Sequence, residues 1–207
     1  MIKLNEGYRD ILDAIASDSP TPGGGSVAAL SLAHAHALVC MVARLTLKSG
    51  KWESGHVSAE KALASSYDGI SSTIDLSHRD AESFDSVMLA FRMPKTTEDE
   101  ISKRKSAIED GYLRASLVPM ETAESGLELL CTLSEIATNC NANAITDLAA
   151  AALLAHSSIS IAALNVRINL ASLGKEHIDL MSGKIENIEI RGARAAKEIS
   201  EIVSGRM

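Results

Sequence analysis

Aromatic side chains are scarce in this sequence. Two Phe, three Tyr and one Trp stand among 207 residues, although hydrophobic residues make up 46% of the chain. The apolar content is therefore mainly Ala, Leu, Ile, Val and Met. Because Ala and Leu enter helices at little cost and strand formers are few, the composition predicts an all-α fold and argues against a β sandwich or barrel. The length suits one domain, and we expect residues 1–207 to form it.

An excess of positive charge is also missing. The chain has 20 Lys and Arg against 27 Asp and Glu, which gives a net charge of −7. General nucleic-acid binding needs cations for the phosphates and aromatic rings for the bases. We therefore expect no nucleic-acid partner.

Paired cysteines and a leader segment are lacking as well. Cys40, Cys131 and Cys140 form no CxxC pair, and an odd number of thiols suits a reducing compartment. The chain does not open with a basic segment followed by an apolar one, so secretion is not indicated. We expect a cytoplasmic protein.

Common cofactor and metal motifs are absent. The sequence contains no GxxxxGK[ST], no GxGxxG and no HExxH, so a nucleotide loop or zinc protease site has no support. His34 and His36 are two residues apart and point to different faces of a helix, which favours core or interface histidines over a metal pair. No metal is expected.

Two long apolar stretches, residues 27–47 and 148–170, match the length of a membrane span. Both contain polar or charged side chains that are costly in hydrocarbon: His34, His36 and Arg44 in the first, and His156, Asn165, Arg167 and Asn169 in the second. We therefore expect central helices of a bundle and no membrane. One small bundle cannot easily cover two such helices, which predicts a homodimer formed through helices.

Proline, glycine and apolar periodicity divide the chain into a single up-and-down helical bundle of six or seven helices. Residues 97–100 have the sequence of a capping box, and Pro119 predicts a break or kink. Ser26 is the expected N-cap of the second helix. The predicted helices are residues 5–17, 26–49, 57–91, 97–118, 120–138, 145–173 and a last amphipathic helix around 178–202.

Asp80 is the strongest local candidate for chemistry. The predicted seam of its helix consists of Leu63, Tyr67, Ile70, Ile74, Ser77, Ala81, Phe84, Met88 and Phe91, which places Asp80 at the edge of the core. No cation lies three or four residues away, whereas Asp75 has Arg79 four residues on. Such an aspartate has a raised pKa suited to proton transfer, unless a cation from another helix pairs with it.

Three further features are polar but ambiguous. The turn of Gly23, Gly24, Gly25 and Ser26 precedes a helix, where it either holds an anion through backbone N–H groups or is simply flexible. Asn165 and Asn169 share a helix face, so they either bind a ligand or belong to a stripe of close helix packing. Asp147 stands at a helix start, where capping is the favoured interpretation.

Positive charge gathers in one segment of this acidic chain. The segment either attracts a polycarboxylate or forms a solvated face. Its members are Lys95, Lys103, Arg104, Lys105 and Arg114.

In their order and spacing, these segments resemble the formimidoyltetrahydrofolate cyclodeaminases and the related methenyltetrahydrofolate cyclohydrolases. The resemblance runs from the first helix to at least Leu173. It is carried by Thr21-Pro22-Gly23-Gly24-Gly25-Ser26-Val27-Ala28-Ala29, Met41-Val42, Asp80-Ala81-Glu82-Ser83-Phe84, Arg92-Met93-Pro94-Lys95, Val118-Pro119, Thr146-Asp147 and Asn165-Val166-Arg167-Ile168-Asn169.

The resemblance implies a dimeric helical domain with a folate site in a cleft near the subunit interface. It implies attack of folate nitrogen-10 on the formimidoyl carbon of nitrogen-5, with loss of ammonia, and it identifies Asp80 with the family's catalytic aspartate. Asp80 would act as general acid and base. Candidates for binding a tetrahydrofolate, including its polyglutamate tail, are Gly23, Gly24, Gly25, Ser26, Lys95, Arg104, Asp147, Asn165 and Asn169.

One position departs from the family pattern. His78 stands where the acidic block usually begins with aspartate, about 200° around the helix from Asp80. Three functions stay open: the cyclodeaminase, the cyclohydrolase that adds water to the methenyl bridge and yields formyltetrahydrofolate, and a non-catalytic folate-binding or scaffold subunit. A separate formiminotransferase is an expected partner of the first.

Overall fold

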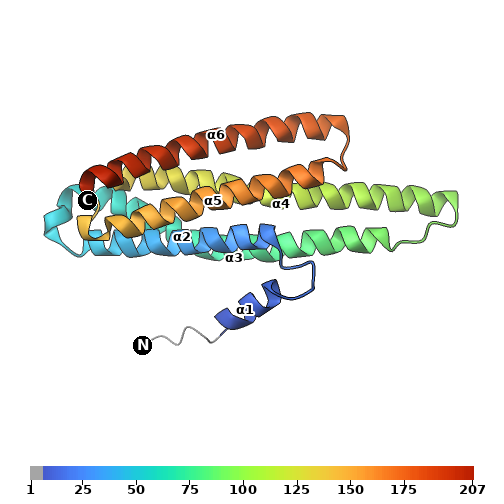
Figure 1. Cartoon of the computed structure of the whole chain (residues 1–207), viewed down its shortest axis with the longest axis horizontal. Helices are drawn as coiled ribbons and strands as arrows, with labels where there is room; N and C mark the ends of the chain where they lie inside the picture. The colour runs from blue at the N-terminus through green and yellow to red at the C-terminus, as the bar shows by residue number, and fades with distance from the viewer. Residues whose placement is uncertain (1–6) are drawn as a thin grey trace.

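Within residues 7–207, which the computed structural model describes, six α-helices and two short 3-10 helices follow one another without a strand. Five long helices lie side by side, and the short first helix is set apart from them (Figure 1). The all-α prediction is therefore confirmed. The helices are α1 Tyr8–Ile15, α2 Gly24–Leu47, η1 Gly50–Gly55, α3 His56–Phe91, α4 Glu98–Ala137, η2 Ala142–Ala144, α5 Ile145–Leu170 and α6 Lys175–Arg206. The predicted start of the first helix at Asn5 lies outside the described residues.

Short connections make successive long helices antiparallel, as in an up-and-down bundle. Helices α2, α3, α4 and α5 pack around a common core, and α6 covers α4 and α5. Consequently the start of α2 and the end of α5 lie at the same end of the bundle, and the end of α3 and the start of α4 extend past them as a hairpin (Figure 1).

At the opposite end, the last turn of α6 closes the end of α4. The Arg206 guanidinium donates hydrogen bonds to the carbonyl oxygens of Ala137 and Cys140. Ala137 is the last residue of α4, where a helix leaves its carbonyls without an internal partner, and Cys140 follows in the connection to η2. Arg206 therefore acts as a C-terminal cap supplied by another helix.

The two apolar stretches differ in how much of them the bundle covers. Both Gly24–Leu47 and Ala142–Leu170 are long and apolar enough to cross a membrane by length and composition. In the structure they are bundle helices, with 61% of the first stretch buried but only 44% of the second. The second stretch thus leaves an apolar stripe of α5 on the surface.

Helix α4 begins where its sequence predicts, but it does not end at Pro119. Its start has the predicted capping box, since Thr97 Oγ1 accepts from the Glu100 N–H and the Glu100 carboxylate accepts from the Thr97 N–H. The predicted break at Pro119 is wrong, because α4 runs through it as one helix of 40 residues. A contact described below explains how the helix tolerates this proline.

The core-facing stripe of α3 is also not the predicted one. Tyr67 is 61% exposed and Ile74 41% exposed, so these large side chains lie outside the core. Apart from Ser77, which was predicted and is buried, the buried stripe is one residue out of register and consists mostly of small side chains: Ala59, Ala62, Ser66, Gly69, Thr73, Leu76, Ser83, Val87 and Ala90. Small residues let α2 and α4 approach α3 closely. Asp80 lies in this stripe, between Leu76 and Ser83.

Candidate active site around Asp80

Asp80 lines a polar cavity of about 290 Å³ formed by four helices. Helices α2 and α5 contribute their end segments, α3 and α4 contribute residues 80–84 and 112–115 below the protruding hairpin, and the connection before α2 forms one rim. The cavity is lined by Pro20, Thr21, Gly23, Gly24, Gly25, Asp80, Ser83, Phe84, Tyr112, Ala115, Asn165, Ile168, Asn169 and Ser172. The fold thus brings Asp80, the glycine turn and both asparagines together.

The Asp80 carboxylate packs directly against Gly25 in the first turn of α2. A Cβ atom at residue 25 would lie 2.2 Å from Asp80 Oδ1 and 2.6 Å from Oδ2. Only glycine at this position leaves room for the carboxylate. The start of a helix also favours a negative charge. The glycine turn therefore has an anion beside it, and that anion is the protein's own Asp80.

Ser26 holds one oxygen of this carboxylate. The predicted N-cap role of Ser26 is wrong, because α2 begins at Gly24 and its N-cap is Gly23. Ser26 instead lies inside the first turn, fully buried, where its hydroxyl can donate to Asp80 Oδ2 at 3.0 Å or to the Ser77 carbonyl oxygen at 3.1 Å. A hydroxyl with two such acceptors can follow a change in the protonation of Asp80.

Burial raises the pKa of Asp80 above its usual range, and the hydrogen bonds from the Ser26 side chain and backbone oppose this only in part. Among residues 7–207 no Lys, Arg or His forms an ion pair with Asp80. The sequence allowed a cation from another helix to pair with Asp80. The side-chain partner of Asp80 is instead the neutral hydroxyl of Ser26. Arg79 pairs mainly with Glu121, with 2.7 Å between Nη1 and Oε2. A carboxyl group of raised pKa without a cationic partner is suited to proton exchange.

Asn169 solves the structural problem that Pro119 creates. Proline has no N–H, so the carbonyl of Ala115 four residues earlier loses its helical partner. Asn169 Nδ2 donates to this carbonyl oxygen at 2.7 Å and joins α5 to α4. The predicted family blocks around Pro119 and Asn169 are therefore in direct contact, and they form one wall of the cavity.

Asn165 lines the same cavity one turn earlier along α5. Its Nδ2 donates to the Ile161 carbonyl at 2.9 Å, within its own helix. A Cβ atom at Gly24 would still be 3.7 Å from this nitrogen, which is ordinary contact. Asn165 thus faces the glycine turn across the cavity without being locked against it.

Three sequence candidates lie away from the cavity. Lys95 is exposed in the connection between α3 and α4, at the tip of a hairpin that extends past the other helices (Figure 1). Arg104 lies in the same hairpin, where its Nη2 donates to the Phe91 carbonyl at 3.2 Å and its guanidinium lies 5.5 Å from the Phe91 ring centroid. Asp147 is in the first turn of α5, roughly 27 Å along the helix from Asn165.

Sequence reasoning missed several cavity residues. Tyr112 lies in a helix of mostly charged residues, so the sequence offered no reason to single it out. In the structure it lines the cavity, and its ring contacts that of Phe91 edge to face, with 6.2 Å between centroids. Phe84 stands four residues after Asp80, a spacing that places both on one helix face and could have identified it. Ile168 is 73% exposed and forms the lip of the cavity.

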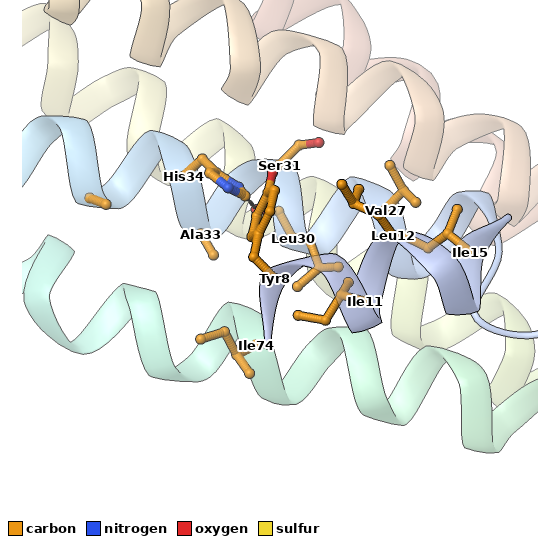
Figure 2. A pocket seen from close by; sticks show the side chains of 11 residues that line it. Tyr8, Ile11, Leu12, Ile15, Val27, Leu30, Ser31, Ala33, His34 and Ile74 are labelled. Atoms are coloured by element: carbon orange, nitrogen blue, oxygen red, sulfur yellow. Dashed lines mark hydrogen bonds between the residues drawn. The ribbon is translucent and has the colours of Figure 1, made fainter. Parts of the chain in front are cut away.

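A second cavity, of about 350 Å³, lies under α1 and is almost entirely apolar. Figure 2 shows Tyr8, Ile11, Leu12 and Ile15 of α1 facing α2, with Ile74 of α3 at the other side. Tyr8 meets the His34 ring edge to face at 6.0 Å between centroids. This cavity has no carboxylate among its lining residues, so it lacks the proton chemistry of the Asp80 cavity.

A metal site is not built from the described residues. Within residues 7–207, no three His, Cys, Asp or Glu side chains gather in a way that could hold an ion. The chemistry that the described cavity offers is therefore that of a carboxyl group, amides and hydroxyls.

Comparisons with known proteins agree with this geometry. The family model described as formiminotransferase-cyclodeaminase matches residues 7–182. A methenyltetrahydrofolate cyclohydrolase of Methylorubrum extorquens is 35% identical over 82% of this chain and 81% of that protein. A formimidoyltransferase-cyclodeaminase of Mus musculus is 31% identical over 82% of this chain, which spans about a third of that longer protein, 31% of its length.

A solved structure is similar over nearly the whole length. It is a formiminotetrahydrofolate cyclodeaminase of Thermotoga maritima, with a TM-score of 0.86, 26% identity and coverage of 98% of both chains. The overall helical arrangement described above thus has a counterpart of the same size.

Proposed function

The chain belongs to the formiminotransferase-cyclodeaminase family, and from this premise we propose that it converts 5-formimidoyltetrahydrofolate to 5,10-methenyltetrahydrofolate with release of ammonia. It is a folate one-carbon enzyme, as its relatives are. The observation that carries the proposal is Asp80, a half-buried carboxyl group of raised pKa set against Gly25 in a polar cavity. This group has no structural ion pair among the described residues that would explain its position.

The proposed reaction moves one proton between two nitrogens of the substrate. Nitrogen-10 forms a bond to the formimidoyl carbon and loses its proton, while the departing nitrogen gains a proton and leaves as ammonia. Asp80 accepts the first proton as a carboxylate and returns it as a carboxylic acid. Its raised pKa suits both roles, and Ser26 can donate to the ionised form or turn toward Ser77 when Asp80 is protonated.

We place the pterin in the cavity and the glutamate tail outside it. Asn165, Asn169 and the backbone of the glycine turn face the cavity and supply polar groups for a pterin edge. Lys95 and Arg104 lie on the protruding α3–α4 hairpin, so in this proposal they meet the anionic tail rather than the ring. Asp147 lies in the first turn of α5, far from the cavity, where its carboxylate stabilises the start of the helix.

A cyclohydrolase is the second candidate function. The Methylorubrum extorquens relative carries that name and is matched over 81% of its length, whereas the mouse protein is matched over 31% of its length. In that reaction Asp80 would accept a proton from the water that attacks the methenyl carbon. The non-catalytic alternative rested on His78, which is exposed on α3 and leaves the Asp80–Gly25–Ser26 arrangement intact.

One assay separates these three functions. The purified chain is given formimidoyl- and methenyl-tetrahydrofolate in separate reactions, and the methenyl absorbance and the ammonia concentration are followed. We expect methenyl absorbance and ammonia to appear together from the formimidoyl substrate. Loss of methenyl absorbance without ammonia would indicate the cyclohydrolase. Failure with both substrates by a folded protein would contradict both enzyme functions.

We also propose that the chain forms a homodimer through α5. Leu153, Leu164 and Ile168 are 65–73% exposed along one stripe of this helix, and large exposed apolar stripes mark interaction surfaces. Because Ile168 also forms the cavity lip, a second copy on this stripe would cover the entrance of the site. L153D/L164D should convert a dimer to a monomer in analytical ultracentrifugation, whereas L180D, at a similarly exposed position on α6, should not.

The cellular setting follows from the same premise. The mouse relative joins a transferase to its cyclodeaminase in one longer chain, so we propose that a separate formiminotransferase supplies the substrate here and that the product of histidine breakdown enters by that route. Cys40, Cys131 and Cys140 are all free thiols, which supports a reducing cytoplasm as the location.

A further inference from the structure

A second polar pocket lies between α3 and α4, with His36 of α2 at its base. Its volume is about 240 Å³, and it is separate from the Asp80 cavity. Gly69 lies in this pocket, eleven residues before Asp80, which is roughly 16 Å along α3. The lining residues are His36, Ser65, Asp68, Gly69, Ser72, Ser125, Glu128, Leu129 and Thr132.

His36 is the unusual group in this pocket. Its side chain is 94% buried, yet neither ring nitrogen forms a hydrogen bond with any of residues 7–207. A Cβ atom at residue 69 would lie 2.4 Å from the ring, so the chain keeps a glycine where the ring needs space. Burial lowers the pKa of His36 to about 4. At neutral pH the ring is therefore uncharged and has one nitrogen that accepts hydrogen bonds.

Three hydroxyls and two carboxylates of the pocket are acceptors as well, and the Ser125 hydroxyl donates to none of residues 7–207. Ser65, Ser72 and Thr132 donate their hydroxyl protons to backbone carbonyls of their own helices, which leaves the oxygen lone pairs for the pocket. Asp68 and Glu128 form no ion pair within 4 Å among the described residues. Carboxylates, hydroxyl oxygens and a neutral imidazole together favour a ligand that is positively charged and rich in hydrogen-bond donors.

We propose that this pocket binds ammonium or a small primary alkylammonium ion. A divalent metal does not fit, because no three metal-binding side chains gather among residues 7–207. Potassium has nearly the size of ammonium but no protons to donate to an imidazole nitrogen, so the pocket should prefer ammonium. The proposal concerns binding alone and is independent of the reaction at Asp80.

The test follows the imidazole nitrogens of His36 by NMR in the full chain labelled with ¹⁵N-histidine. Ammonium chloride, methylammonium chloride and potassium chloride are each added at constant ionic strength. We expect the His36 resonances to shift with ammonium or methylammonium along a saturating curve and to stay in place with potassium. H36Q assigns the signal, and H34Q, two residues away on the exposed side of α2, is the matched control that keeps it.

A second variant keeps the test decisive should H36Q fold poorly. Asp68 and Glu128 are exposed, so D68N/E128Q should fold normally while binding methylammonium about tenfold more weakly. Circular dichroism checks that fold. The proposal is overturned if ammonium causes no saturable shift, if potassium causes the same shift, or if D68N/E128Q binds as tightly as the unchanged chain. In those cases the pocket holds water or any cation without preference.

Discussion

Two titratable side chains cross the interface between α2 and α3, and each lies over a glycine of the other helix. Asp80 of α3 rests on Gly25, and His36 of α2 rests on Gly69. Burial favours the neutral form of both, which raises the pKa of Asp80 and lowers the pKa of His36 to about 4. Asp80 has a hydroxyl partner in Ser26, whereas His36 has no hydrogen bond to the described residues.

The difference shows what separates a reactive group from a buried one. A partner that can donate or turn away lets Asp80 exist in both protonation states, so its raised pKa can be used in a reaction. His36 remains neutral through the physiological range, because burial of its ring disfavours the charged form. In our two proposals, similar packing against glycine thus serves proton transfer at one site and a fixed hydrogen-bond acceptor at the other.

Removing the acid tests the comparison most strongly. D80N should lower kcat by roughly 10²–10⁴-fold in the methenyl absorbance assay, because the amide cannot transfer the proton. Since the pKa of Asp80 is raised on folding, its ionised form destabilises the folded chain, and D80N should be more stable at pH 7. That advantage should fade as the pH falls below the pKa of the unfolded chain. D75N, on an exposed turn of the same helix, is the control, and full activity of D80N would remove Asp80 from its role.

The pH dependence of stability isolates His36. Its pKa falls from 6.5 to about 4 on folding, so the unfolded chain binds more protons between these values and stability rises with pH there. The unchanged chain should lose about 3 kcal/mol relative to H36Q as the pH falls from 6.5 to 4. Urea unfolding at several pH values measures this difference. H34Q should keep the slope of the unchanged chain, and an identical slope in H36Q would contradict the assignment.

Two adjacent glycines test the contact beneath Asp80. G25A places a methyl group 2.2 Å from Asp80 Oδ1 and should displace the carboxylate, with a loss of roughly 10²-fold in kcat/KM. G24A meets its nearest atom at 3.7 Å and should keep nearly full activity. Kinetics of the two variants, with circular dichroism as a check on folding, decide the point. Equal activity of G24A and G25A would show that the position of Asp80 does not depend on Gly25.

The same substitution under His36 should affect stability and not catalysis. G69A puts a methyl group against the ring and should cost about 1–3 kcal/mol of unfolding free energy, reduced by the better helix propensity of alanine. G183A, on α6 with no atom within 4 Å of the new methyl, should gain roughly 0.5–1 kcal/mol. Chemical denaturation measures both changes. A large activity loss in G69A would contradict the prediction that the His36 site affects stability but not catalysis.

Much of the fold was predictable because it depends on local signals. The capping box at Thr97, the breaks at Pro22 and Pro94 and the apolar periodicity place the helices within a few residues. The stripe of α3 was not predictable in this way, since the rule that large apolar residues face the core fails where helices pack closely. Tyr67 and Ile74 lie outside, and Gly69 and Ala62 lie inside, for that reason.

Only some members of the cavity were predictable, since Lys95, Arg104 and Asp147 lie away from it, and the contacts of its members were not predictable. The resemblance identified Asp80, the glycine turn and both asparagines, and the fold brings them to one cavity. Three facts required coordinates: Ser26 serves Asp80 rather than the helix start, Asn169 completes the helix that Pro119 interrupts, and Gly25 makes room for a carboxylate. Each of these contacts joins residues more than 40 positions apart, and local sequence patterns do not predict contacts between such distant residues.

Arg206 has a consequence for the order in which the chain is made. Its guanidinium binds the carbonyls of Ala137, at the end of α4, and of Cys140, more than 60 residues earlier in the chain. Translation proceeds from the N-terminus, so α4 exists long before the arginine that caps its end. This end of the bundle therefore cannot close until α6 has been made as far as Arg206, and a chain without Arg206 keeps every long helix but leaves this end open.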